Sequence, residues 1–399
     1  MDRREFGRAL MGGAAGAGVA GLAQPVQAQA EARDAAFRVL PDLPVRRNDG
    51  IHSGGDYHTV AGQSPTDRVS LDYFRRFNAR YLTVMAHNTV RASDMPEFPH
   101  FGGFLNADGP WDGDQLKRVQ DDCHNAGLVL EGVRMDSAYI IMKEGPLRDR
   151  YLDIIRGNIR KAGAAGATLV SYHWTMTPIR RNFTAPGRGG STYVGFKLEP
   201  NYKDLGVTKA AGVVSSDEYW ERIHYFLQGV LPVCREAKVK LACHPYDPGG
   251  QPLGYLGVDQ WDAVDYATAL KKYVSLIDDP YNCLCYDCGV AGESLPDPNS
   301  QLPLLRYLSE RNRIAQVHFR NIRGHQHNFL EVFEDEGDVN MFNCLRVLRD
   351  TGWNGTLLPD HNPVNPDDPK KLEAYAFSYG YIEGLLKAAR EEAIRVTRA

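Results

Sequence analysis

The sequence predicts an α/β protein, a (β/α)8 TIM barrel that forms a single domain with a long loop insertion. Short apolar runs rich in β-branched and aromatic residues recur along the chain, and a longer segment with helical periodicity follows each of them. None of these runs is followed by the phosphate-binding glycine fingerprint that an open doubly wound sheet would need. The alternation therefore favours parallel strands that close into a barrel, with the helices outside it.

The predicted strands are short, and most of them end in polar side chains. An eighth strand near Ile51, in "NDGIHSGG", gives only a faint signal. The seven clear strands cover Tyr81 to Ala86, Leu128 to Met135, Thr168 to Trp174, Val239 to His244, Asn282 to Cys288, Ile314 to Phe319 and Gly355 to Pro359.

The predicted helices have apolar residues at every third or fourth position. Several should stop at a glycine, as at Gly127, Gly163 and Gly352, because glycine adopts the left-handed conformation that ends a helix. The helices cover Asp112 to Ala126, Leu147 to Ala162, Ser216 to Ala237, Asp259 to Tyr273, Leu302 to Asn312, Asn340 to Thr351 and Lys370 to Ala393.

One long segment, from Asn182 to Val214, has no clear periodicity and contains "APGRGGS". It is predicted to be a loop after the third clear strand. Structureless stretches of this length inside a compact domain are usually functional, and a lid over the site is the typical case.

The first thirty residues are predicted to be an export signal, and residues 31–399 the barrel domain. Asp2-Arg3-Arg4-Glu5-Phe6 precedes an Ala/Gly-rich stretch from Ala9 to Ala23, and Ala28-Gln29-Ala30 offers a small-x-small cleavage site. This pattern is typical of the twin-arginine pathway, so we expect cleavage after Ala30, a periplasmic location and no membrane anchor after cleavage. An anchored transmembrane helix is disfavoured because the stretch is short and rich in glycine.

The composition excludes one class of partner. The chain has 43% hydrophobic and 24% charged residues, a formal net charge of -4 and no polybasic run, so it lacks the positive surface that nucleic-acid binding requires. Small molecules are the expected partners, and a homo-oligomer stays open. Its seven cysteines are an odd number, so at least one must be unpaired.

Polar side chains gather where the predicted strands end. Because the carboxyl ends of parallel strands meet at one mouth of a barrel, these side chains should converge there. Taken singly, each is more often a core or loop residue. Together they offer nitrogen, sulfur and oxygen donors that suit a divalent transition metal with positions open for a substrate. The residues are His173, His244, Asp247, Cys283, Cys285, Asp287, Cys288, His318, Arg320, Asn321, Asp360 and His361.

The cysteines of "NCLCYDC" bear on the kind of site. Alternation along a strand sends Cys283 and Cys285 to one face and Cys288 to the other, so a closed zinc site of three thiolates is geometrically awkward. One inward thiolate is expected. Which of the three it is stays open, with Cys285 preferred. By the same alternation, Val317 and Phe319 should pack outside the barrel while His318 faces its mouth.

From these residues onward, the C-terminal half resembles the mannonate dehydratases, metal-dependent barrels related to xylose-isomerase-like proteins. "LACHPYDP" is similar to the family's "HPDDP", "NCLCYDCG" lies where the family has a single strand cysteine, and "VHFRN" resembles "VHLRN". "FLEVFEDEGDVNM" followed by "LPDHNP" is similar to the family's "FHE…DGDVDM…PDHG". The likeness extends from Leu128 to Lys387.

The resemblance implies metal ligands at His244, Cys285, His318 and Asp360. It implies Mn²⁺ as the ion, with Fe²⁺ or another divalent metal as the alternatives. It further implies that His361 takes part in proton transfer and that Arg320 and Asn321 line the substrate site. The implied reaction is loss of water from an aldonic acid such as mannonate, which gives a 2-keto-3-deoxy acid.

The sequence departs from the family at the positions expected to meet the substrate. "YHWTM" replaces the family's "YNFMP", which places His173 where the family has asparagine and makes it a third catalytic candidate beside His361 and Arg320. Tyr375 or Tyr379 would have to replace a family tyrosine. Because the implied metal residues are intact, a changed substrate is expected. The substrate-binding candidates are Asn321, Asp247, Arg181 and Arg188.

Two other functions stay open. A metal-dependent isomerase or epimerase of the same barrel class would move a proton beside a metal-polarised carbonyl without losing water. A non-catalytic periplasmic sugar-binding protein would not need a four-residue metal set. Export also suggests a substrate that comes from plant or algal polysaccharides rather than from intracellular metabolism.

Overall fold

The computed structural model describes residues 50–58, 67–90, 95, 98, 107–136 and 138–398. The predicted signal in residues 1–30 and its cleavage site lie outside this part of the chain. Within it, no helix combines the length and the apolar character that a membrane span requires.

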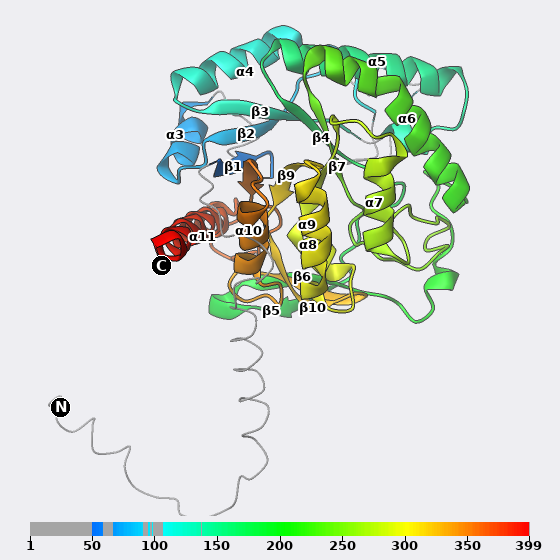
Figure 1. The fold of residues 1–399 in the computed structure, drawn as a ribbon. Helices are drawn as coiled ribbons and strands as arrows, with labels where there is room; N and C mark the ends of the chain where they lie inside the picture. The colour runs from blue at the N-terminus through cyan, green and yellow to red at the C-terminus, as the bar shows by residue number, and fades with distance from the viewer. Residues whose placement is uncertain are drawn as a thin grey trace, which may run out of the picture. The chain divides into compact units, whose positions relative to one another are not determined.

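Eight strands form the barrel, and all of them pair in parallel (Figure 1). They are β1 (Ile51–Asp56), β2 (Tyr81–Met85), β3 (Val129–Arg134), β4 (Leu169–His173), β7 (Lys240–His244), β8 (Asn282–Asp287), β9 (Ile314–His318) and β12 (Gly355–Leu358). The closed order is β1-β12-β9-β8-β7-β4-β3-β2. The predicted fold class is confirmed, and every predicted strand is present.

The faint strand near Ile51 is β1, which closes the barrel between β12 and β2. The apolar pattern of β1 is weak because it contains two glycines at positions where adjacent residues pack too closely for a side chain. A side chain at Gly54 would come 2.3 Å from the carbonyl oxygen of Tyr81, and one at Gly55 would meet the Phe74 ring at 2.1 Å. Tight packing therefore explains the weak strand signal.

The helices of the described residues lie mostly where they were predicted. They are α3 (Arg68–Arg76), α4 (Gly113–Asn125), α5 (Pro146–Ala164), α6 (Ser216–Ala237), α7 (Tyr266–Leu276), α8 (Cys288–Glu293), α9 (Leu302–Glu310), α10 (Met341–Asp350) and α11 (Leu372–Arg398). Gly127 and Gly352 follow α4 and α10 with positive φ, as expected. Gly163 instead lies inside α5, where its missing side chain lets the backbone of Ala237 approach.

The predicted helix from Asp259 begins later than expected. Asp265 caps α7 by accepting a hydrogen bond from the Thr268 amide. The two aspartates before it stabilise loops instead. Asp259 accepts a hydrogen bond from the Gly254 amide, and the buried Asp262 accepts one from the Tyr246 amide. Apolar spacing alone could not reveal that these side chains were used outside a helix.

The segment from Asn182 to Val214 is not a structureless loop, so that prediction is wrong. It contains β5 (Phe183–Pro186) and β6 (Thr192–Lys197), which join β10 (Asn321–His325) and β11 (Asn328–Val332) in an antiparallel sheet of order β10-β11-β6-β5. We call this the accessory sheet (Figure 1). β6 pairs with β11, more than 120 positions later in the chain, so the partner that stabilises β6 is invisible to a local pattern.

Candidate metal centre at the mouth of the barrel

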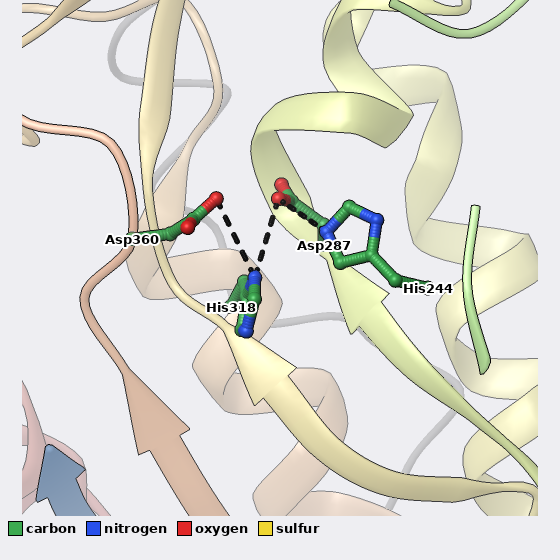
Figure 2. Close-up of side chains that lie close together, drawn as sticks. All are labelled: His244, Asp287, His318 and Asp360. Atoms are coloured by element: carbon green, nitrogen blue, oxygen red, sulfur yellow. Dashed lines mark hydrogen bonds and ion pairs between the residues drawn. The ribbon is translucent and has the colours of Figure 1, made fainter. Parts of the chain in front are cut away.

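Four side chains from the carboxyl ends of β7, β8, β9 and β12 converge (Figure 2). They are His244, Asp287, His318 and Asp360, and each offers a ligand atom within 4.8 Å of all the others. His318 Nδ1 lies 3.4 Å from Asp360 Oδ2 and 3.7 Å from Asp287 Oδ2, and His244 Nε2 lies 3.2 Å from the same Asp287 oxygen. All four residues are buried.

Asp287 is held by the chain that follows it. It is the N-cap of α8, and its Oδ1 accepts a hydrogen bond from the Val290 amide at 2.8 Å. This bond turns Oδ2 toward the two histidines. Burial alone would raise the pKa of Asp287, but Arg320, His244 and His318 outweigh it and hold that pKa well below its usual range. Asp287 is therefore a carboxylate, the form that binds a cation.

Cys285 was expected in this position, and the structure places Asp287 there instead. Both residues lie on the same face of β8, but Cys285 is two residues deeper in the barrel. Its Sγ accepts a hydrogen bond from Gln316 Nε2 at 3.3 Å, and it clusters with Leu169, Ala242 and Cys283. Alternation correctly separated Cys283 and Cys285 from Cys288, which packs in the main core. All seven cysteines are free and buried.

His244 is oriented as a metal ligand would be. Its Nδ1 lies 2.7 Å from the carbonyl oxygen of Pro245, which can only accept, so Nδ1 carries a proton and Nε2 is turned toward Asp287. Metal-binding histidines are usually fixed by such a bond on the other ring nitrogen. Burial lowers the pKa of His244, which favours the neutral, ligating ring.

Arg320, expected to meet the substrate, is instead surrounded by carboxylates. Its Nε lies 3.0 Å from Asp287 Oδ2 and 3.1 Å from Asp360 Oδ2, and a terminal nitrogen lies 3.3 Å from Asp247 Oδ2. Gly289 makes room for it, since a Cβ there would come 2.7 Å from the guanidinium. A buried charge needs such partners. Arg320 therefore holds the carboxylates of Asp287 and Asp360 together.

His58 is a site residue that the sequence did not reveal. It follows β1, and its Nδ1 lies 2.8 Å from Asp56 Oδ2 while its Nε2 lies 3.1 Å from Asp360 Oδ1. The His58 ring lies 6.0 Å from the His361 ring and 5.8 Å from the His318 ring, measured between centroids. The faint strand signal around Ile51 hid its place at the mouth.

His361 lies beside the four-residue cluster, as predicted. Its Nε2 is 3.8 Å from Asp360 Oδ2, and its Nδ1 is 2.5 Å from Glu331 Oε1 on β11. Two predicted substrate-binding residues, Asp247 and Arg181, lie near His361 but are paired with each other. Arg181 donates to both oxygens of Asp247, at 2.7 and 2.9 Å, and also to Glu331. Asp247 Oδ2 lies 3.9 Å from His361 Nδ1.

His173 packs against the cluster from β4. Its ring meets that of His244 edge-on at 4.1 Å, and its Nδ1 lies 3.3 Å from a terminal nitrogen of Arg134 at the end of β3. Burial, together with His244 and Arg134, lowers the pKa of His173 well below its ordinary value. His173 is therefore a neutral ring near the metal ligands.

Two predicted substrate contacts have other roles. The Asn321 side chain is 1% exposed and donates to the carbonyl oxygens of Glu334 and Val339, so it fastens a loop. Arg188 donates to Asp335 at 2.7 Å and stacks over the rings of Phe333 and Phe377, outside the cluster. Loop contacts of this kind depend on residues that the sequence alone does not bring together.

The two tyrosines considered as replacements differ in position. The Tyr375 hydroxyl donates to the carbonyl oxygen of Asp360 at 2.5 Å and so supports the loop that carries this ligand. Tyr379 is buried and stacks against Phe77 with a centroid distance of 6.2 Å. Of the two, Tyr375 is the one that contacts a cluster residue.

The donor set fits a divalent ion. Two imidazole nitrogens and two carboxylate oxygens suit Mn²⁺ or Fe²⁺ better than a thiolate-preferring ion. Within the described residues, the buried His318 Nδ1 has no hydrogen-bond partner although it faces both ligand carboxylates. A buried ring nitrogen in this state is what a bound cation would satisfy.

Solved structures with a similar fold include xylose-isomerase-like TIM barrels. A xylose isomerase domain protein from Alicyclobacillus acidocaldarius aligns with a TM-score of 0.54 and 14% identity, over 85% of this chain and 99% of that one. The mannonate dehydratase of Streptococcus suis serotype 2 aligns with a TM-score of 0.67 and 22% identity, over 86% and 96%. At these identities the likeness shows the fold.

Sequence comparison is more specific. The profile of the D-mannonate dehydratase (UxuA) family matches residues 206–395. The mannonate dehydratase of Streptococcus pneumoniae (strain 70585) is 26% identical over 315 residues, 70% of this chain and 83% of that protein. That of Enterococcus faecalis is 28% identical over 324 residues, 70% and 87% of the two chains. The chain is thus similar to the mannonate dehydratases over about 70% of its length, at low identity.

Proposed function

We propose that the protein is a hydro-lyase that uses a divalent metal to remove water from a sugar acid. The single observation that carries this proposal is the buried cluster of His244, Asp287, His318 and Asp360, in a chain whose relatives are mannonate dehydratases. The substrate class is an aldonic acid of the mannonate type, and the product is a 2-keto-3-deoxy acid. Mn²⁺ is the proposed ion, in keeping with the oxygen and nitrogen donors.

The elimination needs two proton transfers: a base takes the proton from C2, and an acid protonates the C3 hydroxyl, which leaves as water. The resulting enol then becomes the 2-keto acid by gaining a proton at C3 and losing the proton of its C2 hydroxyl to solvent. A bound dication would stabilise the negative charge that develops next to the carboxylate. His361 is the proposed proton carrier, because it lies beside Asp360 and remains partly exposed. His58, the other imidazole that touches Asp360, is the candidate for the second transfer.

The metal cluster also argues against a passive receptor. A sugar-binding protein needs hydrogen bonds and apolar surface around its ligand, whereas this mouth gathers two buried carboxylates and two histidines in an arrangement suited to a metal ion. An isomerase or epimerase would use a similar metal site. The sequence relatives favour dehydration over that alternative.

The test is to incubate the metal-loaded protein with a panel of aldonic acids and to measure 2-keto-3-deoxy acids. We expect keto acid from at least one of them, and an isomeric sugar that keeps all its oxygen atoms would favour the isomerase instead.

We also propose export by the twin-arginine pathway with cleavage after Ala30. Fractionation of cells that express the full chain, followed by mass spectrometry of the mature N-terminus, tests that proposal.

A further inference from the structure

The accessory sheet reaches into the mouth of the barrel through one side chain, Glu331 on β11. Glu331 is 3% exposed, and its Oε1 lies 2.5 Å from Nδ1 of His361. A carboxylate can only accept a hydrogen bond, so the ring nitrogen donates. His361 is thereby held from the side that faces away from the metal cluster.

Glu331 is itself held in place. Arg181, which precedes β5, donates to Glu331 Oε1 from Nε at 2.8 Å and from a terminal nitrogen at 2.5 Å. The same terminal nitrogen donates to Asp247, and the guanidinium packs over the Phe329 ring at 5.2 Å. Because both nitrogens donate to the same oxygen, they hold Oε1 in place beside His361 Nδ1.

With Nδ1 bound to Glu331, the other ring nitrogen of His361 is turned to the site. Nε2 lies 3.8 Å from Asp360 Oδ2, and the side chain remains 27% exposed. Proton transfer by histidine depends on which nitrogen faces the substrate, and a carboxylate on the opposite nitrogen sets this in other enzymes. Glu331 is too far from the four ligands to belong to their cluster.

We propose that Glu331 is a positioning residue for the dehydration, which holds His361 by Nδ1 so that Nε2 meets the substrate, while Arg181 holds Glu331. This inference rests on the proposed function. It links the accessory sheet to catalysis, because Glu331 on β11 and Arg181, two residues before β5, are the side chains that orient the proton carrier.

The test compares E331A and E331Q with the wild-type protein on an aldonic acid that the wild type dehydrates. E331A should lower kcat about 10- to 100-fold with little change in KM, the range seen when a supporting partner of a catalytic group is lost. E331Q should recover part of that loss, because its amide oxygen can still accept from Nδ1. Bound Mn²⁺ should be unchanged in both variants.

E199A is the matched control. Glu199 follows β6 of the same sheet and pairs with Arg180 at 2.7 Å, as Glu331 pairs with Arg181, yet it has no part in the His361 contact. Its kcat should equal that of the wild type. If E331A does not fold, R181M replaces it, since this variant keeps Glu331 but removes its clamp and should lower kcat several-fold.

A measurement without substrate separates this inference from the proposed function. In protein labelled with ¹⁵N-histidine, the His361 signals are those lost in H361N, and their Nδ1 proton should be protected from solvent exchange. Protection should disappear in E331A and persist in E199A. Protection that survives in E331A, an unchanged kcat, or loss of Mn²⁺ would each overturn the positioning role, whereas absence of any keto acid from the wild type would refute only the dehydratase.

Discussion

Asp287 serves the fold and the site with its two oxygens. Oδ1 caps α8 through the Val290 amide, and Oδ2 lies among the ligand atoms of His244 and His318. Alternation along β8 gave Cys285 and Asp287 the same inward face, so the sequence could predict the face but not the depth. Which inward-facing residue of a strand reaches the mouth depends on how the eight strands are shifted along one another. That shift is a property of the whole barrel and cannot be read from one strand.

Substitution of these two residues should separate the alternatives. D287N keeps a good helix cap but removes the charge, so we expect Mn²⁺ affinity to fall at least about tenfold. C285S should leave the affinity unchanged, because Cys285 bonds with Gln316 below the site. Equilibrium dialysis with metal analysis provides the comparison. Retention of Mn²⁺ by D287N together with its loss from C285S would restore the cysteine as the ligand.

At the scale of elements, the accessory sheet connects two distant parts of the chain. β10 and β11 follow directly after β9, the strand that ends at His318, and β5 and β6 come from the segment after β4. Seven of the barrel strands could be predicted clearly because each carries its own apolar pattern, whereas β1 gave only a faint signal. The accessory strands could not, since their stability depends on pairing across the chain.

Asn321, at the start of β10, illustrates the consequence. Its amide donates to the carbonyl oxygens of Glu334 and Val339 and accepts from the Val339 amide, and Gly337 leaves space that a side chain would fill at 2.2 Å from it. N321A should lower the free energy of unfolding by about 3 kcal/mol, because several buried partners lose their bonds. Urea denaturation measures this. A raised KM with unchanged stability would instead support the predicted substrate contact.

For the whole molecule, the proposed metal ligands come from the ends of four strands, between residues 244 and 360. The unfolded chain cannot bring these side chains together, so a metal that binds them must stabilise the native state. The order of strands was predictable because barrel topology follows from repeated βα units. The convergence of strand ends was predictable for the same reason.

Thermal unfolding should therefore depend on Mn²⁺. At a concentration one hundred times the dissociation constant, the native state should gain about 2.7 kcal/mol, seen as a higher Tm that a chelator reverses. H318A should show no such increase, because His318 Nδ1 faces both ligand carboxylates. An equal Mn²⁺-dependent rise of Tm in H318A and in the wild type would place the ion elsewhere.

The most direct test of the central claim, that these four residues support dehydration of a sugar acid, is the product formed in D₂O. NMR of the Mn²⁺-loaded protein with an aldonic acid should show a 2-keto-3-deoxy acid with one deuteron at C3, since the enol takes that proton from solvent. The same reaction should stop after chelation and be absent in H318A. An isomer that retains the C3 hydroxyl, or keto acid formed equally without metal, would contradict the account.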